Sequence, residues 1–176
     1  MKKIEMVDLK GQYEQIKDEV NRSVLETIES TLFINGPKVK SFQDNLEKYL
    51  GVNHVIPCAN GTDALQIALM SLGLKPGDEV ITSNFTFAAT VEVISLLGLT
   101  PVLVDVDPKT FNIDIPSIEK AIGPKTKAII PVHLFGQVAD MGEILALAEE
   151  NNLYVIEDNA QSIGANYTFS DGSKKK

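Results

Sequence analysis

The residues of this chain best suited to binding a ligand lie where apolar runs give way to polar side chains. Asn60-Gly61-Thr62-Asp63 opens a segment with helical spacing. Gly61 lets a ligand approach the backbone closely, Thr62 offers a hydroxyl, and the first N–H groups of a helix point outward at its positive end. These features predict a phosphate site. Because Asn and Thr are also common capping residues, an ordinary helix cap is the competing interpretation.

Two further side chains would complement a phosphorylated ring. Asp158 follows the apolar run 153–156, and a carboxylate at the end of a buried strand needs a cationic partner. A protonated pyridine nitrogen is such a partner, and the charged ring can absorb electrons from a substrate carbanion. Phe87 could stack on an aromatic cofactor. The competing interpretations are a structural hydrogen bond for Asp158 and a core position for Phe87.

Other reactive residue types suggest no separate site. His133 could be a polar site residue, although a lone histidine is more often a hydrogen-bonded neighbour. Cys58 has no ligand spacing with His54 or His133, so no metal site is predicted, and a single cysteine excludes an internal disulfide. The sequence contains neither a Walker pattern nor G-x-G-x-x-G, so nothing in it supports binding of a nucleoside triphosphate or a dinucleotide.

Alternating strand and helix patterns predict how these residues are positioned. Helical spacing predicts two N-terminal helices, one over 12–30 with a buried apolar stripe and one over 39–50. Short apolar strands then alternate with helices. We expect strands at 54–57, 79–82, 101–106, 127–132 and 153–156, and helices at 62–72, 86–97, 115–122 and 141–151. Strands such as 128–132 are apolar on both faces, which is typical of a covered parallel sheet. The pattern predicts a three-layer α/β/α domain over 51–176, preceded by a helical segment over 1–50.

An open parallel sheet binds ligands beyond the carboxyl ends of its strands. The predicted strands place Thr62, Phe87 and Asp158 at that edge. A phosphate cradle, a stacking ring and a strand-end aspartate together match one kind of cofactor, a phosphorylated pyridine. Separation of Thr62 and Asp158 to opposite ends of the sheet would overturn this interpretation.

The composition excludes several classes of protein. Hydrophobic residues make up 44% and charged residues 23% of the 176 residues, as in soluble globular domains. The formal net charge of −8 argues against a nucleic-acid binder. No apolar run is long enough to cross a bilayer, and no apolar signal core follows the N-terminal lysines. We therefore expect a cytoplasmic protein with no nucleic-acid or membrane partner.

Several ordered motifs give the chain a family resemblance that extends from Asp8 to about Gly172. The motifs are Phe33–Pro37, Ala59–Leu65, Pro76–Ile81, Phe85–Thr90, Pro131–Gln137 and Val155–Ala165. In these stretches the sequence resembles the DegT/DnrJ/EryC1/StrS aminotransferases, sugar aminotransferases of the fold-type-I pyridoxal-phosphate class. The resemblance implies the large domain of that fold, here truncated.

Residue by residue, the resemblance implies a site for pyridoxal 5'-phosphate. Thr62 and Asp63 match residues that hold the phosphate, and Phe87 matches the stacking aromatic residue. Asp158 matches the partner of the ring nitrogen. Gln161 matches the residue near the ring hydroxyl, where glutamine favours enzymes acting on 3-keto sugars. The implied cofactor-binding residues are Gly61, Thr62, Asp63, Phe87, Asp158 and Gln161, and the implied substrate-binding residues are Phe33, Asn35, Gly36 and His133.

The implied activity is transamination of a nucleotide-linked keto sugar in polysaccharide biosynthesis. Glutamate is the expected amino donor, and a homodimer is the expected assembly. The family's Schiff-base lysine is expected beyond Lys176, together with the rest of the sheet and the C-terminal domain, so we expect these residues alone to be inactive. Two alternatives are a sugar dehydratase of the same family, in which histidine replaces the lysine, and a non-catalytic truncated binding module.

Overall fold

The structure is a computed structural model that describes residues 7–176. By its internal contacts the chain divides into two compact units, Met1–Pro57 and Cys58–Lys176. All the strands of the described residues belong to the second unit. The division expected from the sequence, after residue 50, falls within the first unit.

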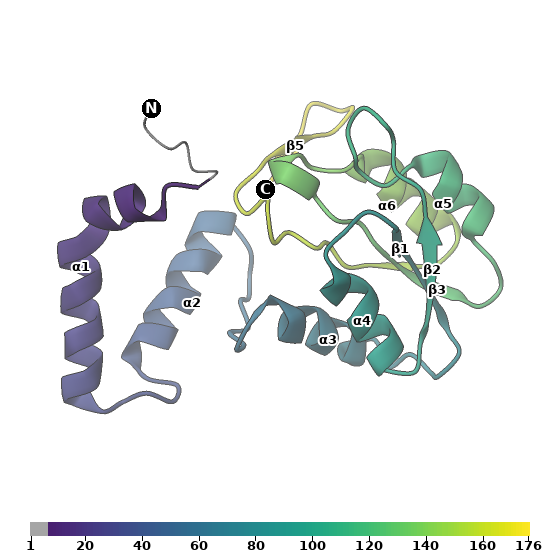
Figure 1. Ribbon diagram of the computed structural model, residues 1–176. Coiled ribbons are helices and arrows are strands. Elements are labelled where there is room, and N and C mark those ends of the chain that lie inside the picture. The colour runs from purple at the N-terminus through teal and green to yellow at the C-terminus, as the bar shows by residue number, and fades with distance from the viewer. Residues whose placement is uncertain (1–6) are drawn as a thin grey trace, which may run out of the picture. The chain divides into compact units, whose positions relative to one another are not determined.

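The first unit contains two helices, α1 (Leu9–Ser30) and α2 (Pro37–Leu50) (Figure 1). The carboxylate of Asp8 caps the first turn of α1, and Lys38 Nζ pairs with Glu26 Oε2 at 2.8 Å, which links the two helices. The expected helices are confirmed, but the buried stripe expected for the first one is wrong, since neither helix contains a buried residue. The described residues of this unit supply no further layer against which the stripe could pack.

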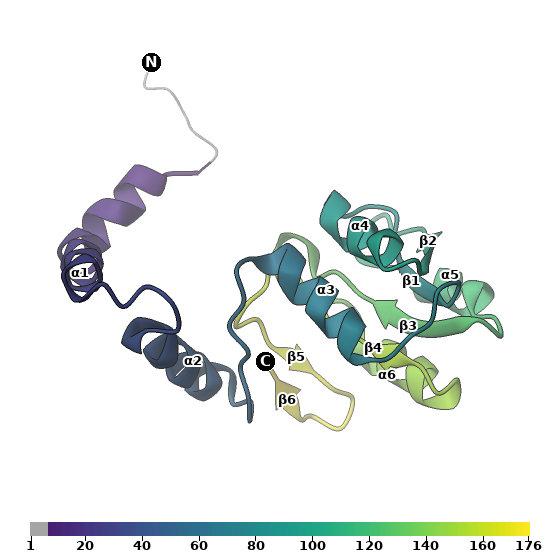
Figure 2. The same ribbon diagram turned by 90° about the horizontal axis from the view of Figure 1, so that it is seen from below.

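The second unit is built on a parallel sheet. Its strands are β1 (Glu79–Ser83), β2 (Thr100–Val104), β3 (Thr126–Ile130) and β4 (Tyr154–Val155), in the order β2-β1-β3-β4 (Figure 2). A parallel bridge between Val132 and Asp158 continues the β3–β4 pairing beyond the regular strands. The main chain of Asp158 is thereby fixed at the carboxyl edge of the sheet.

One expected strand does not form. Residues 54–57 have an irregular backbone, and no strand of the described residues pairs with them. The side chain of Ile56 is 75% exposed, so burial does not favour a sheet position, and Pro57 has no N–H to donate to a neighbour. Asn60-Gly61-Thr62-Asp63 therefore follows an irregular segment instead of a sheet strand.

Helices cover both faces of the sheet. They are α3 (Gly61–Ser71), α4 (Ala88–Leu96), α5 (Ile115–Ala121) and α6 (Met141–Glu150). Successive side chains of a strand point to opposite faces, so β1 contributes Val80 to a core with α3 and α4, and Ile81 to a core with α5 and α6. Figures 1 and 2 show these two helix pairs on opposite sides of the strands. The three-layer α/β/α architecture expected from the sequence is confirmed.

A short hairpin, β5 (Tyr167–Thr168) and β6 (Lys174–Lys175), follows the sheet. It is tied to α6 through Tyr167, whose hydroxyl donates to Asp140 Oδ1 at 2.5 Å and accepts from the Gly142 N–H at 3.1 Å. Asp140 is the N-cap residue of α6. No helix within residues 7–176 combines the length and apolar character that a membrane span needs.

The Tyr167 contact predicts a measurable contribution to stability. Tyr167→Phe should lower the free energy of unfolding by about 1–3 kcal/mol, because it removes two hydrogen bonds, one of them to a carboxylate. The hydrogen bond to Asp140, together with burial, raises the pKa of the Tyr167 phenol above its ordinary value. A raised pKa means that this contribution is complete below about pH 10 and is lost as the pH rises through the raised value.

Urea denaturation at neutral and alkaline pH measures both effects. Tyr154→Phe is the matched control, because its phenol is 52% exposed on β4, and it should leave stability unchanged at neutral pH. Equal stabilities for Tyr167→Phe and the unaltered protein at neutral pH would contradict the prediction.

Candidate functional site

A cavity of about 420 Å³ lies at the carboxyl edge of the sheet, where β1, β3 and β4 end near the first turns of α3 and α4. Its volume falls in the range of small-molecule sites. All of its lining residues belong to the second unit: Gly61, Thr62, Ala64, Leu65, Thr86, Phe87, Ala89, Val132, Leu134, Glu157, Asp158, Asn159, Ala160 and Gln161. Thr62 and Asp158 therefore line the same cavity. The interpretation of the sequence required that these two residues lie at the same end of the sheet.

The first turn of α3 provides donors at one end of the cavity. Asn60 Oδ1 accepts from the Asp63 N–H at 2.9 Å, and Asn60 Nδ2 donates to Asp63 Oδ2 at 3.1 Å. This cap uses the third N–H of the turn and leaves those of Gly61 and Thr62 without a partner among the described residues. The cap and the anion site, posed as alternatives from the sequence, are compatible here, since they use different N–H groups.

Gly61 is not required by packing. A Cβ built on Gly61 would meet no atom within 4 Å, and its backbone φ is not in the left-handed region. Since Gly61 lines the cavity, the space that a side chain would occupy is open to a ligand. The residue keeps the helix N-terminus accessible.

Asp158 is a buried carboxylate that follows β4 in the chain and lines the same cavity as the first turn of α3. Its side chain is 8% exposed. Its Oδ2 accepts from Thr90 Oγ1 at 2.8 Å, and its Oδ1 from the Ala160 N–H at 3.3 Å. Among the described residues, no Lys, Arg or His forms an ion pair with it. A buried carboxylate held by neutral donors leaves its charge to be balanced by a ligand.

Phe87 and Gln161 also line the cavity. The Phe87 ring is 77% exposed, so its alternative interpretation as a core residue is wrong. Gln161 Oε1 accepts from the Phe135 N–H at 2.6 Å. Because this bond occupies the amide oxygen, the NH₂ group of Gln161 is the part that can donate to a ligand.

His133 does not line this cavity, although the sequence suggested a substrate contact. The residue is 1% exposed, and its Nδ1 accepts from the Ala139 N–H at 3.1 Å. Its other ring nitrogen therefore carries the hydrogen and donates to Glu157 Oε2 at 2.8 Å. His133 orients Glu157, which does line the cavity. The structure gives this histidine a supporting position, and direct contact with a substrate remains a prediction.

The remaining predicted site residues lie elsewhere. Asp63 is half-buried and its carboxylate accepts from Asn60, so it contributes to the cap, and it does not line the cavity. Phe33, Asn35 and Gly36 belong to the first unit, and their substrate contacts stay predictions. Gly36 has a local reason to be glycine, because a Cβ there would lie 2.1 Å from the carbonyl oxygen of Leu32.

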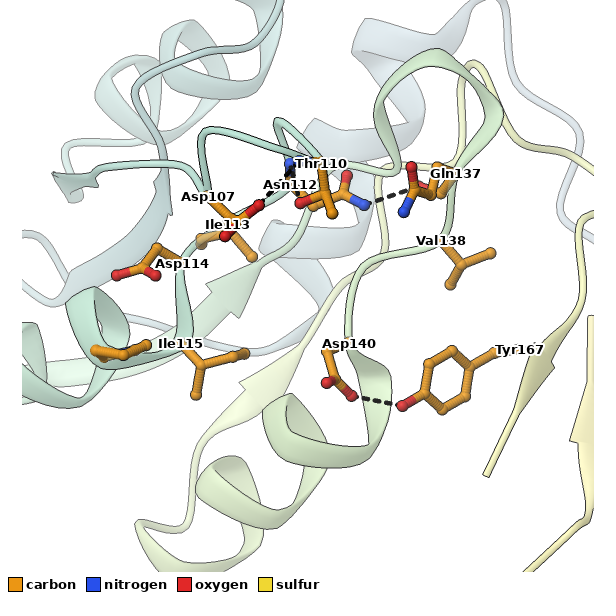
Figure 3. A pocket seen from close by; sticks show the side chains of 11 residues that line it. Asp107, Thr110, Asn112, Ile113, Asp114, Ile115, Gln137, Val138, Asp140 and Tyr167 are labelled. Atoms are coloured by element: carbon orange, nitrogen blue, oxygen red, sulfur yellow. Dashed lines mark hydrogen bonds between the residues drawn. The ribbon is translucent and has the colours of Figure 1, made fainter. Parts of the chain in front are cut away.

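A neighbouring cavity of about 400 Å³ contains several carboxylates (Figure 3). Asp107 accepts from the backbone N–H groups of Thr110 and Lys109, which lower the pKa of its carboxyl group. Asp114 caps α5, and Asp140 is bonded to Tyr167. Each of these three carboxylates thus already serves the local structure of a turn, a helix cap or the hairpin contact. No cluster of three or more His, Cys, Asp or Glu residues within 7–176 is arranged to hold a metal ion.

The sequence interpretation missed some residues of the site. The cavity is also lined by Thr86, Glu157 and Asn159. Thr90 does not line it, but its hydroxyl donates to the Asp158 carboxylate. Asn159 Oδ1 is buried and has no hydrogen-bond partner among the described residues. Thr90 could have been noticed as a polar residue within the apolar segment that forms α4, four residues after Thr86. Its contact with Asp158 depends on chain packing, which local spacing does not reveal.

Known proteins match this chain over nearly its whole length. The model of the DegT/DnrJ/EryC1/StrS aminotransferase family matches residues 14–172. A UDP-2-acetamido-2-deoxy-3-oxo-D-glucuronate aminotransferase of Pseudomonas aeruginosa is 51% identical over 164 residues, which cover 93% of this chain and 46% of that relative. The chain therefore spans less than half the length of this relative.

Two solved structures share the fold. A DegT DnrJ EryC1 StrS aminotransferase from Brucella abortus superimposes with a TM-score of 0.89 at 45% identity, over 92% of this chain and 45% of that one. NtdA from Bacillus subtilis, solved with bound cofactor PMP, has a TM-score of 0.81 at 41% identity, over 90% of this chain and 35% of that one. Both similarities cover nearly the whole of the present chain.

Proposed function

Because this chain belongs to the DegT/DnrJ/EryC1/StrS aminotransferase family, we propose that its cavity binds pyridoxal 5'-phosphate and that the whole protein aminates a nucleotide-linked keto sugar. The architecture is that of the large domain of fold-type-I pyridoxal-phosphate enzymes. One observation carries the proposal: a cavity of about 420 Å³ is lined by two helix N–H groups that have no partner within residues 7–176, and by a buried carboxylate that has no cationic partner there.

The phosphate would bind at the N-terminus of α3. The N–H groups of Gly61 and Thr62 and the Thr62 hydroxyl offer donors at the positive end of the helix. Asp63, for which the sequence suggested direct contact, would act indirectly by pairing with Asn60 and fixing the cap. This division keeps a carboxylate away from the phosphate, where like charges would repel.

The ring would lie between Phe87 and the apolar wall, with its nitrogen toward Asp158. Ala89, Val132 and Leu134 contribute apolar lining. Asp158 would stabilise the protonated nitrogen, and the bound cofactor then supplies an electron sink for the substrate carbon. The NH₂ group of Gln161 would donate to the ring oxygen, because the Phe135 N–H already occupies its amide oxygen.

The substrate is proposed to be a 3-keto sugar linked to a nucleotide, with glutamate as the amino donor. The P. aeruginosa relative is named for a 3-oxo sugar, and Gln161 is the glutamine that the family resemblance associates with 3-keto substrates. The product would supply polysaccharide biosynthesis. The cytoplasmic location expected from the sequence is part of the same proposal.

Transamination also needs a lysine that holds the cofactor and moves a proton. No lysine is among the residues that line the cavity within 7–176. We propose that this lysine comes from a part of the protein beyond Lys176. The residues described here would then bind and orient the cofactor, and the lysine would complete the chemistry.

A substitution at Gly61 tests the phosphate end of the site. Gly61→Ala should bind pyridoxal phosphate at least about tenfold more weakly, because the added methyl group enters the cavity beside the N–H donors. The fold should not lose stability, since the methyl group meets no protein atom and alanine favours a helix over glycine by about 0.5–1 kcal/mol. Fluorescence titration with the cofactor and thermal unfolding measure the two effects. Unchanged affinity would argue against this phosphate position.

A substitution at Asp158 tests the activity. The full-length protein should transfer an amino group from glutamate to a nucleotide-linked 3-keto sugar, detected by mass spectrometry of the product. Asp158→Asn removes the charge and should lower kcat by about a hundredfold or more, the scale of losing a preorganised electrostatic contact. Asp105→Asn is the matched control, because Asp105 is also a strand-end carboxylate but does not line the cavity. No amination with any 3-keto sugar tested would refute the proposed substrate class.

A homodimer is proposed for the whole protein. Phe85, Phe111 and Phe135 form an aromatic patch whose ring centroids lie 5.7–6.5 Å apart. Their side chains are 47%, 44% and 71% exposed. A contiguous exposed aromatic group beside a ligand cavity is typical of an interaction surface, and a second copy of the chain is the partner that the family resemblance implies.

A change at Phe111 tests this assembly without straining the fold. Phe111 has a left-handed backbone with φ of 60°, a conformation that asparagine tolerates well. Phe111→Asn should therefore fold normally, yet it should shift the full-length protein from dimer toward monomer in analytical ultracentrifugation. A dimer of unaltered strength in this variant would exclude the patch from the interface.

A further inference from the structure

Two threonine hydroxyls connect α4 to the Asp158 carboxylate. Thr90 lies in the first turn of α4 and is fully buried, with 0% of its side chain exposed. Its Oγ1 lies 2.8 Å from Asp158 Oδ2 and 3.2 Å from Thr86 Oγ1. Thr86 lines the cavity and Thr90 does not. Thr90 therefore contacts Asp158 from the protein side.

The direction of these hydrogen bonds follows from the chemistry of the groups. An ionised carboxylate can only accept, so the single hydrogen of the Thr90 hydroxyl must point to Asp158. Thr90 Oγ1 can then only accept from Thr86, whose hydroxyl must be the donor. The two threonines form a one-way chain that ends on Asp158 Oδ2.

The main chain of Asp158 is fixed independently of this contact. Its N–H donates to the Pro131 carbonyl at 2.9 Å, and its carbonyl accepts from the His133 N–H at 3.1 Å. These bonds leave the side chain free to rotate about its own bonds. The remaining protein contact of the carboxylate, from the Ala160 N–H, is longer at 3.3 Å. The Thr90 hydroxyl is thus the shortest contact that sets the carboxylate orientation.

We propose that Thr90 is a positioning residue that aims the Asp158 carboxylate into the cavity. The inference rests on the proposed function, because it concerns how Asp158 meets the ring nitrogen of pyridoxal phosphate. The Thr90 hydroxyl and the Ala160 N–H use part of the acceptor capacity of the two oxygens, and the rest serves the ligand. Thr90 touches neither the cavity nor the ligand and acts only through Asp158.

A second buried threonine provides a matched comparison. Thr82 on β1 is also 0% exposed, and its Oγ1 donates to the Ile130 carbonyl at 2.9 Å. Thr82→Val and Thr90→Val each replace a buried hydroxyl by a methyl group of similar volume. Only the second change removes a donor from Asp158. A general effect of losing a buried hydroxyl should therefore appear in both variants. An effect on the orientation of Asp158 should appear only in Thr90→Val.

The experiment uses the full-length protein with pyridoxal phosphate. Thr90→Val should raise the dissociation constant of the cofactor about tenfold to a hundredfold, the range for losing a hydrogen bond to a charged group. It should also weaken the circular dichroism of the bound cofactor relative to its absorbance, because the ring is held less firmly. Thr90→Ser keeps the hydroxyl and should restore both properties to within about twofold. Thr82→Val should lower the urea midpoint but leave both cofactor properties unchanged.

The outcomes separate this inference from the function on which it rests. Wild-type affinity and dichroism in Thr90→Val would overturn the positioning role while leaving the proposed function intact. Equal cofactor losses in Thr82→Val and Thr90→Val would also overturn it, since the effect would then be general. Failure of the unaltered protein to bind pyridoxal phosphate would instead refute the proposed function and the inference together.

Discussion

The burial of Asp158 without a cationic protein partner is the constraint on which the rest of the site depends. A charged group removed from water is costly unless hydrogen bonds and an opposite charge compensate it. Here the protein provides neutral donors from Thr90 and Ala160 but no cation among the described residues. The folded chain thus holds a carboxylate whose electrostatic complement is missing, and a cationic ring would supply it.

The rest of the second unit explains how this carboxylate keeps its place. The pairing of β3 with β4 extends through the Val132–Asp158 bridge, so the main chain of Asp158 is part of the sheet. Alternating strand residues pack both faces of that sheet against helices. The same arrangement brings the N-terminus of α3 to the cavity. A positive helix end and a negative side chain then line one cavity, which favours a ligand carrying both charges.

Much of this arrangement could be predicted from the sequence, because it depends on local patterns. Apolar strands separated by helical spacing predicted the layers, and positions at the ends of the strands predicted one site with Gly61, Thr62, Phe87 and Asp158. The family resemblance added Gln161, and the cavity contains all five residues. The expected strand that did not form has a physical explanation. Residues 54–57 read as a strand because apolarity alone does not show whether a neighbouring strand is present. The position of His133 depended on Ala139 and Glu157, which local spacing could not connect to it.

The backbone is also strained near the cavity, at Phe135. Phe135 adopts a left-handed backbone with φ of 56°, a conformation that costs a bulky residue on the order of 1–3 kcal/mol. This turn directs the Phe135 N–H to the amide oxygen of Gln161, and so determines which end of that amide faces the ligand. The conformation also leaves the Phe135 ring exposed. One turn thus both fixes the amide of Gln161 at the cavity and leaves an aromatic ring exposed on the surface.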